Sequence, residues 1–142
     1  MLPESGCPID FAATVFGDRW TLLILRDLAR GKRHFKNMLG SDEGIAANIL
    51  SARLKRLERF GLVERRVDPA SRRQVLYELT EKGLDLAPIM VELALWSAKY
   101  DPHTLVTRDF VARARSDREG LIRDTMQRLA PKGGAEGACV HR

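Results

Sequence analysis

Cysteine and histidine are scarce in this sequence, and the motifs that usually carry catalysis or metal binding are missing. The two cysteines, Cys7 and Cys139, are too few and too far apart for a disulfide framework or a zinc site. The three histidines lack the spacing of metal ligands. There is no glycine-rich phosphate loop, no HExxH and no nucleophile elbow. We therefore expect no metal, no cofactor and no enzymatic activity; the alternative is a catalytic dyad assembled only in space.

Long hydrophobic runs are also missing. The longest apolar stretch, residues 84–98, contains Asp85, Pro88 and Glu92 and is shorter than the roughly 20 residues that a membrane span needs. Residues 1–6 have no basic start followed by an apolar run, so we expect no secretion signal. The 142 residues are enough for one domain, or for one domain with an appendage. These absences predict a soluble, cytoplasmic protein without membrane contact.

The net charge of +5 comes from one part of the chain. Residues 30–73 carry 12 Lys and Arg against 5 Asp and Glu, whereas residues 1–29 carry 2 against 4 and residues 74–142 carry 10 against 10. A localised excess of cations is the electrostatic signature of a surface that binds nucleic acid. The charge distribution therefore directs attention to residues 30–73.

A basic amphipathic helix is predicted inside this segment, over residues 44–61. At about 100° per residue, its leucines 50, 54 and 57 fall within one arc. Small polar side chains suit base edges and cations suit phosphates, so the opposite side is suited to a DNA duplex. The alternative is a solvated basic helix on an unrelated protein. The residues on that opposite side are Asn48, Ser51, Ala52, Lys55, Arg56 and Arg59.

Three shorter helices are predicted before the basic helix, over residues 7–16, 20–29 and 32–39. Pro8 suits the first turn of the first helix, and Gly31 suits the end of the second. A glycine-containing turn over residues 40–44 then leads into the basic helix. Two helices joined by a short turn, the second one basic, predict a helix-turn-helix.

After Gly61 the hydrophobic period changes from 3.6 to 2, which predicts a β-hairpin. Its strands contain residues 63–67 and 75–79, its turn is at residues 68–71, and Arg72 and Arg73 lie at its tip. A basic hairpin directly after a basic helix is typical of the wing of a winged helix. The alternative is an ordinary solvated hairpin whose arginines limit edge-to-edge pairing.

A long helix is predicted over residues 81–100, with a kink caused by Pro88. Of the 15 residues from 84 to 98, 11 are apolar, so the helix needs cover on nearly every side from a second subunit or from the C-terminal segment. We favour a homodimer, because two-fold symmetry gives two DNA half-sites. Helices over 105–115 and 120–129 are the other candidate cover. Residues 131–142 are glycine-rich and predicted to be disordered.

The order of these elements and several local runs resemble the HxlR-type family of winged helix-turn-helix transcriptional regulators. The resemblance covers about residues 7–101, and the segment after Pro102 exceeds the shorter family members. The matching runs are Cys7-Pro8-Ile9, Trp20-Thr21-Leu22-Leu23-Ile24, Gly31 followed by Phe35, Ile45 to Glu58, Gly61-Leu62-Val63-Glu64-Arg65, Tyr77-Glu78-Leu79-Thr80 with Gly83, and Trp96.

The resemblance implies a mainly α fold with a small β-hairpin, in which residues 1–101 form the winged helix-turn-helix domain. Nothing carries over to residues 102–130, whose own helical pattern predicts an extension for dimerisation or cover. The resemblance also implies a homodimeric regulator, here expected to be a repressor, on a two-fold-symmetric operator of double-stranded DNA. The wing tip departs from the family, which often has a Pro-Pro-basic run there. By resemblance, Ala47, Asn48, Ser51 and Lys55 face the major groove, and Arg72 and Arg73 belong to the wing.

Cys7 is a candidate redox sensor. Its place before Pro8 predicts the N-cap of a helix, where the helix dipole favours the thiolate and so increases reactivity toward oxidants and electrophiles. Some members of the family resemble redox sensors with a cysteine at this place. The alternative is a small buried apolar residue. Trp20 and Trp96 are candidates to line the pocket of a small-molecule effector, although packing is the more common role of such residues.

Three classes of function remain open from the sequence. The first is a dimeric DNA-binding regulator. The second is a protein-interaction module whose basic patch meets an acidic partner. The third, an enzyme, is disfavoured by the missing motifs. Retardation of duplex DNA at low salt distinguishes the first from the second.

Overall fold

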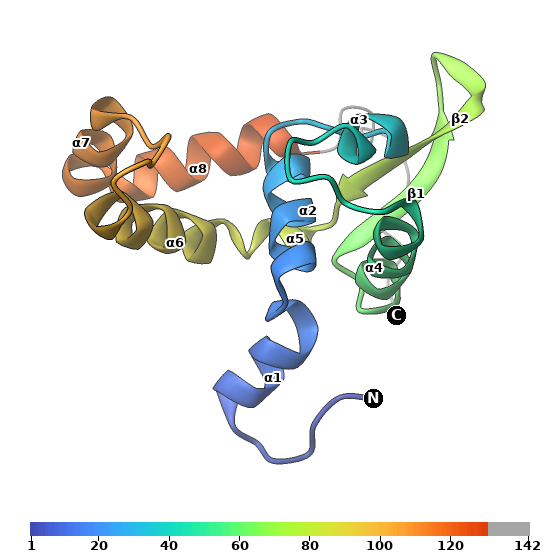
Figure 1. The fold of residues 1–142 in the computed structure, drawn as a ribbon, viewed down its shortest axis with the longest axis horizontal. Coiled ribbons are helices and arrows are strands. Elements are labelled where there is room, and N and C mark those ends of the chain that lie inside the picture. Colours follow the sequence, from blue (N-terminus) through green and yellow to red (C-terminus); the bar gives the residue numbers. More distant parts are fainter. Residues whose placement is uncertain (131–142) are drawn as a thin grey trace, which may run out of the picture.

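The computed structural model describes residues 1–130, which form eight helices and one antiparallel hairpin (Figure 1). The predicted disordered tail, residues 131–142, lies outside the described residues. No helix among residues 1–130 is long and apolar enough to cross a membrane. In chain order the elements are α1 (Pro8–Phe16), α2 (Arg19–Ala29), α3 (Phe35–Leu39), α4 (Ala47–Arg59), β1 (Val63–Asp68), β2 (Ser71–Leu79), α5 (Glu81–Leu84), α6 (Ala87–Tyr100), α7 (Arg108–Ser116) and α8 (Arg118–Leu129).

The predicted helix-turn-helix is present as α3 and α4, and α2 precedes it. Asp18 caps α2, because its carboxylate accepts the backbone N–H of Thr21 at 3.0 Å. The chain leaves α4 at Gly61, whose φ of +74° is the left-handed conformation that favours glycine. Both α3 and α4 are shorter than predicted, since residues 32–34 and 44–46 lie outside any helix. The basic helix therefore begins at Ala47.

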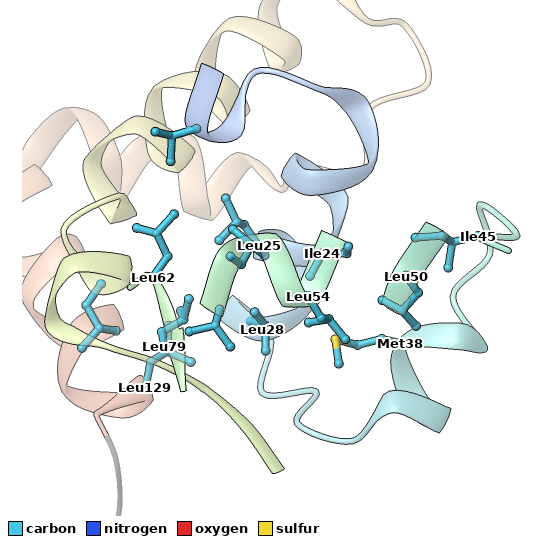
Figure 2. Close-up of a cluster of buried hydrophobic side chains, with 14 residues drawn as sticks. Ile24, Leu25, Leu28, Met38, Ile45, Leu50, Leu54, Leu62, Leu79 and Leu129 are labelled. Atoms are coloured by element: carbon cyan, nitrogen blue, oxygen red, sulfur yellow. The ribbon is translucent and has the colours of Figure 1, made fainter. Parts of the chain in front are cut away.

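The core lies where α4 crosses α2 and α3 (Figure 2). Leu50, Leu54 and Leu57 are fully buried, as their spacing predicts. They pack in one cluster with residues such as Ile24 of α2 and Met38 of α3. Each buried leucine contributes about 2 kcal/mol of transfer free energy. This burial fixes which side of α4 faces solvent.

The predicted hairpin is also present, and it extends beyond the body of the molecule (Figure 1). β1 and β2 pair antiparallel from Val63 opposite Leu79 to Val67 opposite Val75. The next pair is Asp68 opposite Ser71, so residues 72–74 are extra residues on β2. The turn is therefore Pro69–Ala70, and Arg72 and Arg73 lie in β2 just after the tip rather than at the tip itself.

The single long helix predicted over residues 81–100 is wrong: two helices occupy that range. α5 ends at Leu84, and α6 starts at Ala87 with Pro88 in its first turn. Proline has no N–H to donate, and its ring clashes with the carbonyl four residues earlier in a continuous helix. At the start of a helix neither problem arises, because the first N–H groups have no helical partner. Pro88 therefore separates two helices instead of kinking one.

The segment after residue 101 folds back along α6 as α7 and α8. Ala114 of α7 and Leu121 of α8 are buried in a small second cluster with Val91 of α6. At the other end of α8, Leu129 enters the main core. The cap of α8 is Asp117, whose carboxylate accepts the N–H of Gly120 at 3.0 Å. The extension covers one side of α6.

Candidate nucleic-acid interface

The outer side of α4 is a polar and cationic surface exposed to solvent. Ala47, Asn48, Lys55 and Arg59 are exposed, and Ser51 is half-buried beside them. They share one side because α4 buries its leucines on the other. The first turn of α4 carries no acidic residue, and its N-cap, Ala46, offers no side-chain acceptor. The first N–H groups of α4 therefore have no capping side chain within the described structure.

A third side of α4 faces the junction between α1 and α2. Arg53 Nε donates to Asp18 Oδ1 at 3.1 Å, and Arg56 Nη2 donates to the carbonyl oxygen of Thr14. The Arg56 guanidinium also lies over the ring of Phe60, 5.5 Å from its centroid. Arg56 was predicted among the DNA-facing residues; in the structure it is half-buried and bonded to α1. At about 100° per residue, the angle around the helix axis between positions 56 and 60 is smaller than that between 56 and 48. Arg56 therefore points toward the side of Phe60 and not toward the side of Asn48.

Asp18 joins the two sides of this junction, and its side chain does so as a charged carboxylate. Burial raises the pKa of its carboxyl, but the hydrogen bonds from Thr21 and Arg53 outweigh burial, so the pKa is lower than the usual value. The carboxylate both caps α2 and pairs with a side chain of α4. The start of α2 and the middle of α4 are therefore joined by one charged group.

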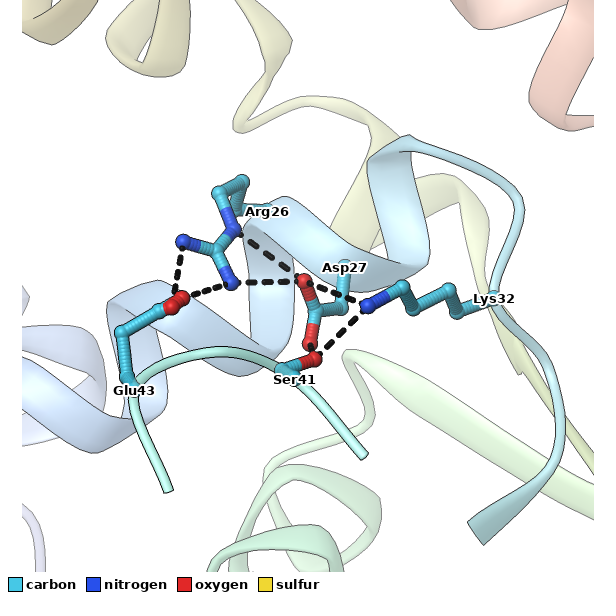
Figure 3. Close-up of polar contacts among 5 residues, drawn as sticks. All are labelled: Arg26, Asp27, Lys32, Ser41 and Glu43. Atoms are coloured by element: carbon cyan, nitrogen blue, oxygen red, sulfur yellow. Dashed lines mark hydrogen bonds and ion pairs between the residues drawn. The ribbon is translucent and has the colours of Figure 1, made fainter. Parts of the chain in front are cut away.

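A polar cluster ties the end of α2 to the loop that leads into α4 (Figure 3). Asp27, only 3% exposed, pairs with Arg26 at 2.8 Å and accepts the hydroxyl of Ser41. Arg26 reaches on to Glu43 at 2.6 Å, and Lys32 approaches Asp27 at 3.8 Å. The hydrogen bond from Arg26 lowers the pKa of Glu43. Sequence reasoning missed this cluster, although Asp27 stands on a mostly apolar helix, where a buried acid needs partners.

The hairpin is attached to the body through charged groups of its own. Glu78, buried on β2, accepts hydrogen bonds from Arg33 at 2.7 Å and from Arg66 of β1 at 2.9 Å. Nearer the tip, Asp68 lies 2.9 Å from His34 Nε2. The hydrogen bond from His34, followed by one from the Ala70 N–H, lowers the pKa of Asp68. These contacts hold the hairpin at one angle to the body.

The arginines of the hairpin therefore fall into two groups. Arg66 is half-buried and paired with Glu78, whereas Arg65, Arg72 and Arg73 are exposed. Arg72 and Arg73 lie among the extra residues of β2, which have no partner across the ladder. Arg72 and Arg73 are thus exposed in β2, next to the tip at which they were predicted.

Cys7 is exposed at the N-cap of α1, as its place before Pro8 predicts. The backbone carbonyl of Cys7 accepts the N–H of Phe11 at 3.0 Å, which starts the helix. No group of three or more His, Cys, Asp or Glu within residues 1–130 could hold a metal ion. The alternative prediction, a small buried residue, is wrong for this cysteine within the single chain.

The two tryptophans do not share a pocket in the described part of the chain. Trp20 is half-buried on α2 and lines a cavity of about 10 Å³. Trp96, on α6, is 67% exposed and lies beside Tyr100, with ring centroids 5.3 Å apart. The two side chains do not line one effector pocket. Trp20 packs against the core, whereas Trp96 does not.

Comparison with known proteins assigns the family. Residues 15–105 match the family model described as HxlR-like helix-turn-helix. The chain is 36% identical over 101 residues to YvaP of Bacillus subtilis, an uncharacterised HTH-type transcriptional regulator. This alignment covers 70% of this chain and 94% of YvaP.

Two solved structures give the same result. The crystal structure of PA1607 superposes with a TM-score of 0.67 at 33% identity and covers 74% of each chain. The redox regulator HypR, in its oxidised form, superposes with a TM-score of 0.60 at 30% identity and covers 66% of this chain and 96% of HypR. The helix-turn-helix, the hairpin and these similarities have one explanation: the chain belongs to the HxlR-like helix-turn-helix family of transcriptional regulators.

Proposed function

We propose that this regulator binds double-stranded DNA, with α4 in the major groove and the hairpin on the adjacent backbone. The observation that carries the proposal is a division among the cations of residues 30–73. One group donates hydrogen bonds to other groups of the protein and consists of Arg33, Arg53, Arg56 and Arg66. The other group is exposed on α4 and the hairpin and consists of Lys55, Arg59, Arg72 and Arg73. A cationic surface built in this way suits a polyanion.

The exposed residues have separate roles in this proposal. Ala47, Asn48 and Ser51, near the start of α4, contact base edges, because short side chains allow the helix to approach the groove closely. Lys55 and Arg59, with Arg72 and Arg73 on the hairpin, contact phosphates. The uncapped first turn of α4 offers N–H groups to one further phosphate oxygen. Arg56 is assigned to holding α1 against α4, not to DNA.

We propose further that the regulator is a homodimer that represses transcription by occupying a two-fold-symmetric operator. Four large apolar side chains are exposed on α6 at positions i, i+4, i+7 and i+11, which share one side of a helix. An exposed apolar stripe of this size is typical of a subunit interface. A two-fold dimer presents two copies of α4 to successive major grooves. The stripe is Ile89, Leu93, Trp96 and Tyr100.

Selection of bound fragments from a genomic library, followed by gel retardation and footprinting, tests this function. We expect retardation at low salt, a palindromic site with half-sites about one helical turn apart, and steep loss of affinity as salt increases. A reporter gene downstream of the selected site should be less transcribed when the protein is present. Failure to retard any duplex at low salt, together with co-purification of an acidic protein, would favour a protein-interaction module instead.

We also propose that oxidants act on the regulator through Cys7. Two observations support this: the thiol is exposed at the N-cap of α1, and HypR, a structural neighbour, is a redox regulator. The test compares operator binding before and after a thiol oxidant, in the wild-type chain and in Cys7→Ser. Oxidation should change the affinity of the wild type and leave Cys7→Ser unchanged. An equal response from both chains would assign the effect to another group.

A further inference from the structure

His34 joins the helix-turn-helix to the hairpin. It is the N-cap of α3, and its carbonyl oxygen accepts the N–H of Met38 at 3.2 Å. Its side chain makes no capping hydrogen bond to α3. Instead, His34 Nε2 lies 2.9 Å from Oδ2 of Asp68, the last residue of β1. The imidazole therefore connects the start of α3 to the hairpin close to its tip.

Asp68 uses its two carboxylate oxygens for different contacts. Oδ1 accepts the N–H of Ala70 at 2.8 Å and so stabilises the turn at the tip. Oδ2 faces His34. The side chain of Asp68 is 11% exposed, so little water competes for these contacts. One carboxylate therefore links the shape of the tip to its position on the body of the protein.

The base and the tip of the hairpin are held in different ways. At the base, Arg33 and Arg66 both donate to Glu78, at 2.7 and 2.9 Å. Arginine side chains keep their charge, so this contact does not depend on protonation of the donors. Beyond Asp68, the extra residues of β2 have no partner across the ladder. The pair of Asp68 with His34 is the one ion pair at this end of the hairpin in the described part of the chain, so the position of the tip depends on it.

The charge of His34 determines how strong this contact is. Histidine is the side chain whose charge changes between about pH 5 and 8, and the His34 side chain is exposed enough to exchange protons with solvent. A neutral imidazole donates an ordinary hydrogen bond to Asp68, whereas a protonated one donates a charge-assisted bond that is roughly twice as strong. The protonated form also neutralises a carboxylate that lies close in sequence to Arg72 and Arg73. Protonation therefore strengthens the contact and favours an anionic partner at the tip.

The other charged groups on the elements packed around His34 pair with one another. Arg66 of β1 and Arg33 share Glu78 of β2. α4 packs against α3 through the apolar core, and none of its residues forms an ion pair with His34 among the residues described. The hydrogen bond from His34 is the largest cause of the lowered pKa of Asp68, and the charge of Arg66 is a smaller one. Asp68 is therefore charged wherever histidine titrates, and His34 is the member of the pair that changes.

We infer that His34 and Asp68 are positioning residues for DNA binding, and that protonation of His34 holds the hairpin tip where Arg72 and Arg73 meet the phosphates. The inference rests on the DNA binding proposed above. Because the charged contact favours the bound position, each chain takes up a proton at His34 when a duplex binds. DNA affinity therefore increases as the pH falls from about 8 to about 5.5.

The pH profile of DNA binding tests this inference, measured by fluorescence anisotropy at constant ionic strength on a duplex selected by the wild type. The wild type should bind about threefold to tenfold more tightly at about pH 5.5 than at about pH 8. His34→Gln keeps a neutral donor and should bind weakly at every pH. His34→Arg keeps a charged donor and should bind tightly at every pH. His103→Gln, at an exposed histidine between α6 and α7, is the matched control and should keep the wild-type profile.

A measurement without DNA follows the tip itself. Spin labels at Asn37→Cys on α3 and Ala70→Cys at the tip, both exposed sites, report the distance between body and tip. The labelled chain also carries Cys7→Ser and Cys139→Ser and is diluted with unlabelled chain. The distance distribution should be narrow at about pH 5.5 and broader at about pH 8. Asp68→Asn should give the broad distribution at both pH values, and circular dichroism checks that each variant is folded.

The outcomes separate this inference from the proposed function. If the wild type binds the duplex with the flat pH profile expected for His34→Gln, the contact does not position the hairpin, and the regulator stands. A profile that is the same in the wild type and in both His34 variants assigns the pH dependence to another group and also overturns the inference. Failure of the wild type to bind any duplex at any pH would contradict the proposed function, while the label distances would still test the contact.

Discussion

The outer side of α4 and the outer side of α6 are both exposed, and they differ in every other respect. The first is polar and cationic, and charged contacts hold its surroundings: Asp18 on one side and the Asp27 cluster on the other. The second presents Trp96 and Tyr100 to solvent, 67% and 61% exposed, and its one ion pair to another helix within residues 1–130 joins Glu92 to Arg118 of α8. A polar surface needs no cover in water, whereas an apolar stripe does. The contrast supports the proposal that the first surface binds nucleic acid and the second binds protein.

The largest effect is expected from the cluster that supports α4. Asp27→Ala removes the buried acceptor shared by Arg26, Lys32 and Ser41. Arg26 keeps Glu43 as a partner, so the expected loss is about 3 kcal/mol of the free energy of unfolding. Urea denaturation measures the loss. Asp42→Ala, at an exposed acid in the same loop region, is the control and should change stability little. Equal stability of the two variants would show that the cluster does not support α4.

The hairpin arginines should matter next, and for all DNA sequences alike. Replacing Arg72 and Arg73 with Ala removes four cations from a dimer, so the slope of log K against log salt should fall by about 3 to 4. Affinity at low salt should fall on the order of 100-fold. Retardation assays across salt concentrations measure both quantities. An unchanged slope would exclude these side chains from the phosphate contacts.

Breaking the apolar surface should affect association before it affects folding. Trp96→Asp places a charge in the α6 stripe and should weaken the dimer by about 2 kcal/mol or more. Sedimentation of the free protein measures this, and Val67→Asp on the hairpin is the matched control. DNA affinity should fall as a consequence, because a monomer contacts one half-site. A dimer of wild-type strength would move the interface away from this side of α6.

A smaller and more selective change is expected at the start of α4. Asn48→Ala should reduce discrimination at one base pair in each half-site by about 1 to 3 kcal/mol, while non-specific affinity stays near that of the wild type. Selection of binding sites with both proteins detects the relaxed position. Lys55→Ala is the contrasting variant, since loss of a phosphate contact should weaken all sites equally.

The smallest effect is expected from pH at the hairpin. The hydrogen bond from His34 holds the pKa of Asp68 below its ordinary value of about 3.9, so the charged form stabilises the folded state above pH 4. This contribution is lost as the pH falls through the lowered pKa of the folded state. Asp68→Asn should therefore flatten the acid part of the stability curve. Identical curves for both chains would show that Asp68 does not contribute.

Prediction from the sequence succeeded where a hydrophobic period agreed with residues that begin or end a helix or strand. The leucines of α4, the hairpin after Gly61 and the N-cap position of Cys7 follow from spacing and from the residues that begin or end elements. It failed where two local tendencies competed. The apolar pattern of residues 81–100 suggested one helix, but Pro88 starts a new helix, because there its missing N–H costs nothing.

The amino-acid sequence by itself determined the order of the helices, the hairpin, the inner side of α4 and the concentration of positive charge in residues 30–73, since these depend on local spacing and composition. Only the tertiary structure decided which charges are available. Arg56 and Lys55 are neighbours in sequence, yet one bonds to α1 and the other faces solvent. The pairing of Asp27 with Ser41 and Glu78 with Arg33 likewise joins residues distant in the chain. Such pairings depend on how helices pack, which no local pattern records.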